Sequence, residues 1–579
     1  MKSNRPKLHL NLYWHMHQPD YRDIVTNEYV LPWTYLHAIK DYSDMAFHLE
    51  ANPAARVSFN FVPILLEQLE DYSEQFRLNH IRDPLLALLV EADLADISHE
   101  QCHLIVQSCF KSHHEKMLSP FPHYQRLLQI YRLLETMACN DEFHYLTAQY
   151  KADLLVWYHL AWCGESLRRD SKVVQALMAK GVLFTLEERQ QLFSVIAETV
   201  SQLIPRYKSL MDSQQIEIST TPYYHPILPL LLDFKSTLDA MPDAPLPENA
   251  EYAGGQKRAI AHMVSAKKSH ALRFGEEPRG MWPAEGGVSH EALSLMAEHG
   301  VEWAATGQAV LANSLVKSQL SADNKDEYLY QPYRVTNGKN DIFCFFRDDQ
   351  LSDKIGFEYA KMNAADAVID FIQTLERIQQ ANDSDSKQAK IVSVILDGEN
   401  AWEYYPYNGY YFLSELYAAL ANHPDIKMTT FSDIVDLYQS REYKRHGLSA
   451  PVLPQVAAGS WVYGTFSTWI GSKDKNLAWD LLCEAKKTYD EVLSKTDLEA
   501  RQLAACERQL AICEGSDWFW WFGDYNSSDS VASFDQLYRR NLINLYTLLQ
   551  QPVPAVLHTS ISAGGGHADN AGTMRRGQE

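Results

Sequence analysis

Seven short apolar runs, most of them separated by helical patterns, constrain the fold of this chain more than any other feature of its sequence. Short strands alternating with helices are typical of α/β proteins, and this pattern favours a parallel βα barrel over an open sheet, although periodicity alone does not decide closure. Several runs end in polar or charged residues, which indicates one functional rim. The runs lie at residues 8–14, 57–61, 215–219, 280–282, 301–306, 342–346 and 390–396.

Two long helical regions accompany the runs. Residues 64–205 have helical periodicity over a length far beyond a usual crossover, which predicts a helical insertion. After residue 447 the strand signals fade, and amphipathic stretches at 476–512 and 530–550 predict a C-terminal helical bundle. We therefore expect a barrel domain over residues 1–446, a helical domain over 447–561 and a disordered tail over 562–579.

Size and charge restrict the class of protein. A chain of 579 residues, 46% of them hydrophobic, is long enough for two or three structural units. A net charge of -22 argues against nucleic acid or an anionic membrane as partner, because both need a basic face. A neutral substrate is compatible with this charge. The sequence does not set the oligomeric state.

Three further features of the sequence indicate the cellular compartment of the protein. The basic N-terminus is followed by an apolar run that His15 interrupts, so it fails as a signal peptide. There is no run of 18 or more apolar residues. The eight cysteines lack CxxC or CxxxC spacing, which indicates reduced, mostly buried thiols instead of a disulfide frame or zinc site. We expect a soluble, cytoplasmic protein.

Glu285 closes the stretch Gly-Met-Trp-Pro-Ala-Glu that begins at Gly280. On a turn after a strand it is a candidate nucleophile or general base, with Trp282 beside it to pack against a ring and exclude water. The alternative is an ordinary surface acid on a loop. The presence of a second carboxylate at another strand end favours the functional interpretation.

That second carboxylate is Asp397, directly after the apolar run 391–396. Partial desolvation at the exit of a buried strand raises the pKa of a carboxyl group, which suits a general acid. Glu399 lies two residues further on and either tunes Asp397 by like-charge repulsion or caps the helix expected after Tyr410.

His15 and His17 precede Gln18 and Pro19 at the end of the first run. Because side chains alternate along a strand, both histidines point the same way. They are candidates to ligate zinc, to hydrogen-bond sugar hydroxyls, or to be satisfied inside the core. A metal needs a third and usually a fourth ligand, and no HExxH motif or cysteine pair supplies one.

Glu217 alternates with isoleucines at 216 and 218, so it points to the opposite face. That face is either the barrel interior, toward a substrate, or solvent.

Tryptophans form a further candidate group: Trp461, Trp469 and the cluster around Trp520 lie beside glycine and serine, outside clean helical periodicity. They fit a carbohydrate cleft, in which flat rings stack on sugars, and equally a hydrophobic seam between barrel and bundle.

Five stretches in order resemble the sequence regions of glycoside hydrolase family 57, an α-glucan-active family. They are residues 15–19, 215–230, 280–285, 394–402 and 459–461. Leu-Asp-Gly-Glu-Asn-Ala-Trp-Glu at 396–403 and Gly-Ser-Asp-Trp-Phe-Trp-Trp at 515–521 are most similar to its amylopullulanase-like branch. The resemblance runs from about residue 8 to residue 546.

The resemblance implies a distorted (β/α)7 barrel with a helical C-terminal domain, and a retaining mechanism on α-glucosidic bonds. In it, Glu285 aligns with the nucleophile and Asp397 with the general acid/base. Arg279 is a candidate to keep the nucleophile ionised by charge pairing. The remaining predicted substrate-binding residues are His15, His17, Gln18, Glu217, His225, Trp282, Glu399, Trp402, Trp461, Trp469 and Trp520.

Our hypothesis is a retaining hydrolase of α-1,4 bonds, with α-1,6 bonds as a second option, in glycogen, starch or maltooligosaccharides, without metal or cofactor. A carboxylate on one face of the sugar attacks C1 while an acid on the other protonates the leaving oxygen. A 4-α-glucanotransferase or branching enzyme differs only in the acceptor. Two further hypotheses are a metal-dependent hydrolase or deacetylase using His15, His17 and an acid such as Asp397, and a non-catalytic glucan-binding protein.

Overall fold

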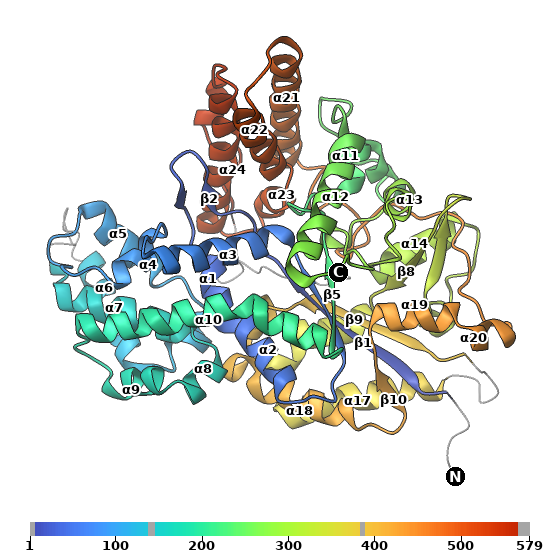
Figure 1. The fold of residues 1–579 in the computed structure, drawn as a ribbon, viewed down its shortest axis with the longest axis horizontal. Coiled ribbons are helices and arrows are strands. Elements are labelled where there is room, and N and C mark those ends of the chain that lie inside the picture. Colours follow the sequence, from blue (N-terminus) through green and yellow to red (C-terminus); the bar gives the residue numbers. More distant parts are fainter. Residues whose placement is uncertain (1–5, 137–144, 382–387, 566–579) are drawn as a thin grey trace.

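The computed structural model describes residues 6–136, 145–381 and 388–565. Figure 1 shows a barrel region flanked on the left by a group of helices and covered at the top by a second helical group near the C-terminus. The α/β class predicted from the alternating runs is confirmed, and each predicted run forms a strand or a strand-like bridge in the barrel.

The barrel is a ring of parallel pairings. β1 pairs with β4 on one side and β9 on the other, β4 pairs with β5, and β6 pairs with β8. Residues 280–282 join β5 to β6 through single bridges, and one bridge between Arg347 and Ser393 closes the ring from β8 to β9. The strands are β1 (Leu8–Met16), β4 (Val57–Phe61), β5 (Ile216–Thr220), β6 (Trp303–Thr306), β8 (Asp341–Phe346) and β9 (Ile391–Asp397).

Single bridges at three joints make this a distorted (β/α)7 barrel, as expected. Three short pairings were not predicted from the sequence: the hairpin of β2 (Arg22–Asp23) and β3 (Glu28–Tyr29), the antiparallel β7 (Tyr333–Thr336) and β10 (Ile426–Met428). At two to four residues each, they are too short to give a strand periodicity.

The barrel interior is filled with aromatic side chains and closed at its amino end. Tyr13, Trp303 and Phe345 lie on three different strands and belong to one buried cluster inside the barrel. Alternate residues of a strand share a face, so the cluster also contains Ala305 and Phe343. Phe431, at the start of α19 (Phe431–Gln439), packs against the rings of Tyr13, Trp303 and Phe345, with ring centroids 5.5, 4.7 and 4.4 Å away, respectively. The amino end is thereby plugged, so the carboxyl end is left for a site.

Helices cover the outside of the barrel and pack against the outward-facing leucines of β1. Those that follow or connect its strands are α1 (Trp33–His37), α2 (Ser43–Glu50), α11 (Leu228–Leu232), α12 (Gly255–Phe274), α13 (His290–Glu298), α14 (Gln308–Lys317), α15 (Lys325–Tyr328), α16 (Asp349–Asp353), α17 (Ala364–Gln380), α18 (Tyr410–Ala421) and α20 (Arg441–Arg445).

The predicted helical pattern between β4 and β5 is observed as a group of helices. Capping boxes start two of them, at Ser98 and Thr185. α7 is buried on nearly all sides, in agreement with its mostly apolar sequence. The group comprises α3 (Pro63–Leu78), α4 (Pro84–Leu89), α5 (His99–Ser108), α6 (Pro122–Thr136), α7 (Ala148–Trp162), α8 (Glu165–Asp170), α9 (Lys172–Lys180) and α10 (Leu186–Asp212).

The C-terminal region is helical, as its amphipathic stretches predict. It contains α21 (Lys473–Lys495), α22 (Ala500–Cys513), the short α23 (Asp517–Trp521) and α24 (Ser528–Leu548), which stand above the barrel in Figure 1. The described residues end at residue 565, so most of the predicted disordered tail lies outside them. The seven cysteines among the described residues are buried, as expected.

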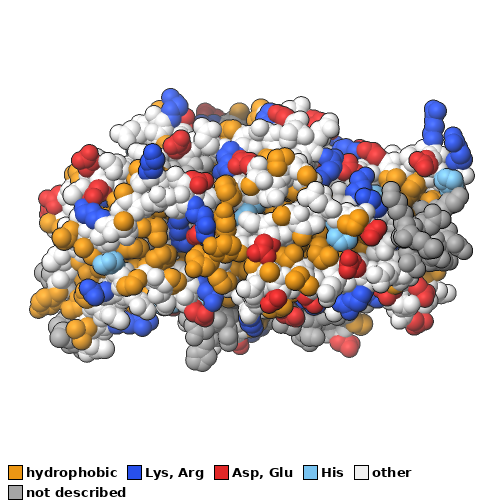
Figure 2. Space-filling view, turned by 90° about the horizontal axis from the view of Figure 1, so that it is seen from below, with side chains coloured by type: hydrophobic (Ala, Val, Ile, Leu, Met, Phe, Trp, Pro, Cys, Tyr) orange, Lys and Arg blue, Asp and Glu red, His pale blue; other side chains and the backbone are white. Residues whose placement is uncertain are grey.

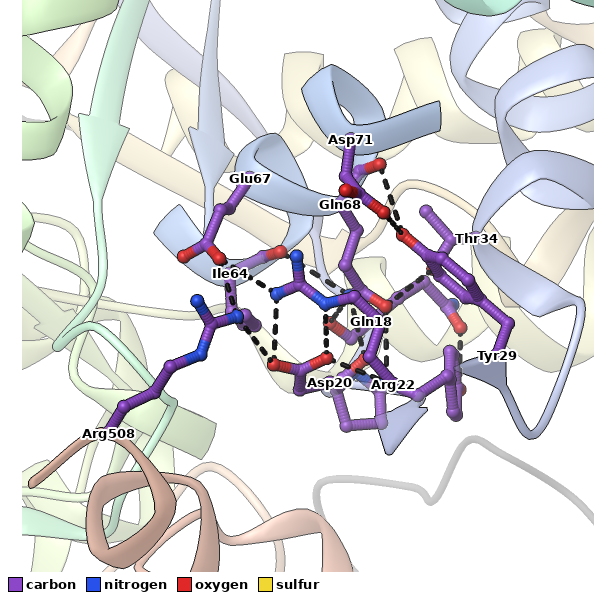
Figure 3. A network of polar contacts seen from close by, with 12 residues as sticks. Gln18, Asp20, Arg22, Tyr29, Thr34, Ile64, Glu67, Gln68, Asp71 and Arg508 are labelled. Atoms are coloured by element: carbon purple, nitrogen blue, oxygen red, sulfur yellow. Dashed lines mark hydrogen bonds and ion pairs between the residues drawn. The ribbon is translucent and has the colours of Figure 1, made fainter. Parts of the chain in front are cut away.

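A polar network fastens the C-terminal helices to the segment that leaves β1 (Figure 3). Arg508 of α22 lies 2.6 Å from Glu67 and 3.4 Å from Asp20, and Arg22 lies 2.8 Å from Asp20. Burial opposes ionisation of Asp20, but the two arginines outweigh it and hold its pKa below the ordinary value. These ion pairs thus hold the C-terminal helices against the segment that follows β1.

Among the described residues, no helix is both long and apolar enough to cross a membrane.

Candidate active site

Three histidines form a stack at the carboxyl end of β1. His15 and His17 share a face, as predicted, and the ring of His225 lies 5.2 Å from the first and 3.9 Å from the second. His15 Nδ1 is 2.7 Å from Asn60 Oδ1, on the neighbouring strand β4. Burial, and then the proximity of His17, lower the pKa of His15 to about 3, so its ring is neutral at physiological pH.

The C-terminal region completes this stack with two residues. His17 Nε2 is 2.7 Å from Asp517 Oδ1, and His225 Nδ1 is 2.9 Å from Ser516 Oγ. Neither Ser516 nor Asp517 was predicted as a site residue. Their signal was present, since both lie in the stretch 515–521 that resembles the family, of which the prediction used the aromatic residues alone.

Asp397 ends β9 and continues the inward face that carries Ile391 and Ile395. Its backbone pairs with His15, so the carboxyl group lies in the same layer as the histidines. Burial raises the pKa of Asp397 to about 6, against the opposing influence of Asn400, His17 and Arg347. This is the direction expected for a carboxyl group at the exit of a buried strand.

Glu285 lies on a single 3-10 turn, Ala284–Gly286, and has a φ of 56° in the left-handed region. That conformation costs a residue with a side chain about 1 to 2 kcal/mol, and such strain is concentrated at functional sites. Trp461 holds the turn from the loop after residue 459: its Nε1 donates to Glu285 Oε2 at 3.0 Å and its backbone N–H to the Glu285 carbonyl at 3.3 Å.

Trp461 and Arg347 link Glu285 to the strand that ends at Asp397. The guanidinium of Arg347 lies 5.4 Å from the centroid of the Trp461 ring and donates to the Ile395 carbonyl at 2.9 Å. Arg347 follows β8 directly and is buried. Arg347 was not among the predicted site residues. It follows an apolar run directly, as Asp397 does, so the same sequence signal could have identified it.

Arg279 does not have its predicted partner. Its guanidinium pairs with Glu302 and Asp436, both at 2.7 Å, instead of with the nucleophile candidate Glu285. The physical reason is position on the strand-like segment 280–282, since Arg279 precedes this segment and Glu285 follows it. The two side chains therefore belong to opposite ends of the barrel.

Glu217 points into the barrel, as one of its two interpretations predicted, but at the wrong end for a substrate. It accepts hydrogen bonds from Trp303 Nε1 at 2.9 Å and from the backbone and hydroxyl of Ser432, a residue of the plugging helix α19. Burial raises its pKa. Its role is to satisfy polar groups at the closed amino end.

Gln18 and Glu399, both predicted to bind substrate, are hydrogen-bonded to each other. Gln18 Nε2 donates to Glu399 at 3.0 Å and Gln18 accepts from Tyr21, while Tyr42 donates to the other oxygen of Glu399. Burial, and next the nearby Asp397, raise the pKa of Glu399 well above the ordinary value. Glu399 does not cap α18, whose N-cap is Gly409.

Most of the predicted tryptophan platforms are core residues. Trp282 and Trp469 are 0% exposed and Trp402 is 1% exposed, so these rings offer no face to a sugar. Trp520, at 7%, packs against Trp469 within the C-terminal region. Tertiary packing decides this outcome, and of the named tryptophans Trp461 alone is partly exposed beside a carboxylate.

His17, His225 and Asp517 could also hold a metal ion, because one ligand atom of each lies within 4.8 Å of the others. His17 Nδ1 and His225 Nε2 are buried atoms without a hydrogen-bond partner. Sequence spacing indicated two histidines and no further ligand. The metal hypothesis assumed His15, His17 and an acid such as Asp397. Among the described residues this group contains His17 but neither His15 nor Asp397, and its other members are His225 and Asp517.

The chain matches one family model and several solved structures. The model of glycosyl hydrolase family 57 matches residues 11–451. No curated protein matches the chain in sequence. A branching enzyme from Thermococcus kodakaraensis is similar in structure, with 13% identity and a TM-score of 0.56 over 97% of this chain and 98% of that one.

Two further structures have different activities in their names. The α-amylase AmyC from Thermotoga maritima has 13% identity and a TM-score of 0.54 over 94% of this chain and 93% of that one. A 4-α-glucanotransferase from Thermococcus litoralis has 14% identity and a TM-score of 0.50 over 93% of this chain and 60% of that one. At such identities the likeness shows the fold and leaves the specific activity open.

Proposed function

The chain belongs to glycosyl hydrolase family 57, and from this premise we propose that it cleaves α-glucosidic bonds of α-glucans with retention of anomeric configuration. The observation that carries the proposal is the arrangement of Glu285 and Asp397, which both follow strands of one barrel and are linked through Trp461 and Arg347. Phe431 of α19 packs against Trp303 and Phe345 inside the barrel, which supports placing the sugar at the carboxyl end.

In this mechanism Glu285 attacks C1 and Asp397 protonates the leaving oxygen. The Trp461 N–H stabilises negative charge on Glu285, which favours the ionised form that a nucleophile needs. Burial keeps Asp397 protonated at mildly acidic pH. The neutral rings of His15 and His225 can hydrogen-bond sugar hydroxyls without adding charge. Retention requires the two carboxyl groups to lie about 5 to 5.5 Å apart, close enough for direct attack on C1 and for a covalent glucosyl intermediate, which water then hydrolyses with Asp397 as the base.

The pKa of Asp397 predicts the alkaline limb of the pH profile. Because the acid must carry a proton in the first step, kcat/KM should fall tenfold per pH unit once the pH rises above about 6. Rates on maltoheptaose between pH 4 and 9 measure this limb. A kcat/KM that stays constant up to pH 8 would exclude an Asp397 with a pKa of about 6 as the proton donor.

Hydrolysis is the proposed outcome, with transfer as the alternative on the same fold. Names among the similar structures include an α-amylase, branching enzymes and a 4-α-glucanotransferase. Product analysis on maltoheptaose, amylopectin and pullulan distinguishes them. We expect reducing ends to rise steadily with maltoheptaose and amylopectin. Products longer than maltoheptaose without net reducing ends would instead identify a transferase.

Membership of the amylopullulanase-like branch is a narrower proposal, supported by the stretches 396–403 and 515–521. It predicts release of maltotriose from pullulan, which requires cleavage of α-1,6 bonds. Pullulan left intact under conditions that degrade amylopectin would restrict the enzyme to α-1,4 bonds.

A metal-dependent hydrolase is the second candidate, favoured by the grouping of His17, His225 and Asp517. The direct hydrogen bond between His17 Nε2 and Asp517 Oδ1 occupies one potential ligand atom of each residue without an ion, so we expect activity on maltoheptaose to survive chelation. Elemental analysis of the purified protein, with rates before and after EDTA treatment, checks this. One zinc per chain, lost together with activity, would establish the metal reaction instead.

A further inference from the structure

The segment that follows Asp397 carries exposed tyrosines on the outside of the barrel. Tyr407 is 58% exposed and Tyr411 is 44% exposed, and their ring centroids lie 5.5 Å apart with the planes at 89°. Tyr407 belongs to the 3-10 turn Pro406–Gly409, and Tyr411 to the first turn of α18. Large aromatic side chains held this far out of the core are available to a ligand.

The backbone holds Tyr407 outward at a conformational cost. Tyr407 and Asn408 have φ values of 54° and 53°, and Gly409 follows at 73°. Asparagine and glycine tolerate this left-handed region, but tyrosine does so rarely. The turn is fixed from below: a Cβ on Gly409 would lie 2.7 Å from the ring of Trp402, and Asn408 donates to Asp44 at 2.9 Å. Strain of this kind is often retained at ligand clamps.

A cation completes the surface. Arg169 of α8 donates to the Tyr411 hydroxyl at 3.0 Å, and its guanidinium lies 4.2 Å from the centroid of the Tyr410 ring. Glu165, at 2.9 Å, fixes it from the other side. In Figure 1, α2, α8 and α18 lie along the lower edge, and Figure 2, which views the molecule from below, shows hydrophobic side chains gathered on this face beside Lys and Arg.

We propose that Tyr407, Tyr411 and Arg169 form a second α-glucan contact, outside the catalytic residues, that holds a chain of a polymeric substrate. Tyrosine rings stack on the apolar faces of glucose units, while the guanidinium and phenol groups hydrogen-bond their hydroxyls. A neutral polysaccharide is indifferent to the acidic net charge of the protein. The platform lies on the chain segment that leaves Asp397, whose carboxyl group Asn400 contacts at 3.4 Å. The inference rests on the proposed function, since it names the same substrate class.

The test uses the full chain with Tyr407→Ala and Tyr411→Ala combined. Glycogen binding is measured by affinity electrophoresis in a Glu285→Gln background, so that the polysaccharide stays intact. We expect about tenfold weaker retention by glycogen, since two stacking rings are lost. With Glu285 present, kcat/KM on maltotetraose should stay within about twofold, because a short substrate does not need the platform. Tyr411→Phe should retain most of the binding.

The matched control is Tyr145→Ala, which removes another tyrosine, 67% exposed, from the helical insertion. Unchanged glycogen retention in the double variant, or an equal fall on maltotetraose, would overturn the platform. So would sedimentation showing that the tyrosines mediate self-association while glycogen binding is unaffected. If instead the parent protein turns over neither maltoheptaose nor glycogen, the proposed function itself fails, whatever the tyrosine variants do.

Discussion

Replacing Glu285 by Gln is expected to lower kcat on maltoheptaose by about 10⁴-fold or more, since an amide cannot attack C1 and the covalent route is lost. The replacement keeps the size of the side chain, and an amide oxygen can still accept the Trp461 N–H that now reaches Glu285 at 3.0 Å. Because the contacts persist, the melting temperature should change little. Steady-state rates and thermal unfolding of the same preparation separate the two effects.

The matched control is Glu291→Gln, on the exposed first turn of α13 a short distance along the chain. Its kcat should remain within about twofold of the parent value, as for other surface substitutions. If Glu285→Gln retains more than a tenth of the parent rate, the nucleophile is another group.

Asp397→Asn is expected to have the second largest effect, about 10² to 10⁴-fold on kcat/KM for maltooligosaccharides, because the leaving oxygen then departs without a proton. The loss should depend on the leaving group. A maltosyl fluoride, whose fluoride leaves with little help, should react with the variant far better than maltoheptaose does. The buried carboxyl with a pKa near 6 should also vanish from the pH profile.

Asp425→Asn serves as the control, since this exposed aspartate precedes β10 at the amino end of the barrel. It should leave both substrates unaffected. An Asp397→Asn enzyme equally slow on fluoride and on maltoheptaose would indicate a structural defect or a different proton donor.

The strands, and the positions of Glu285 and Asp397 after strand segments, could be predicted because each depends on local sequence. A run such as 391–396 is apolar apart from Ser393 because β9 is buried on both faces, and a carboxyl group at its end is partly desolvated wherever the strand lies. Closure of the ring could not be predicted, since it rests on the single bridge between Arg347 and Ser393 and on the three residues 280–282.

The partners of the site residues depend on distant packing and were not predictable in the same way. His17 and Asp517 are separated by 500 positions, and nothing near His17 indicates that its partner comes from the C-terminal region. The burial of the tryptophans also depends on distant packing that the local sequence does not reveal. Trp282 and Trp461 each follow a glycine by two residues, yet of the two Trp461 is the one that reaches Glu285, because the loop that bears it packs on the Glu285 turn.

The most direct test of the central claim, that Glu285 forms the covalent intermediate in a two-carboxylate site with Asp397, is to trap that intermediate. A slowly reacting fluorinated maltosyl fluoride is incubated with the full chain, which is then digested and mapped by mass spectrometry. We predict one glycosyl group per chain, carried by the peptide that contains Glu285. A label on another residue, or no label together with β-anomeric initial products from maltoheptaose, would contradict it.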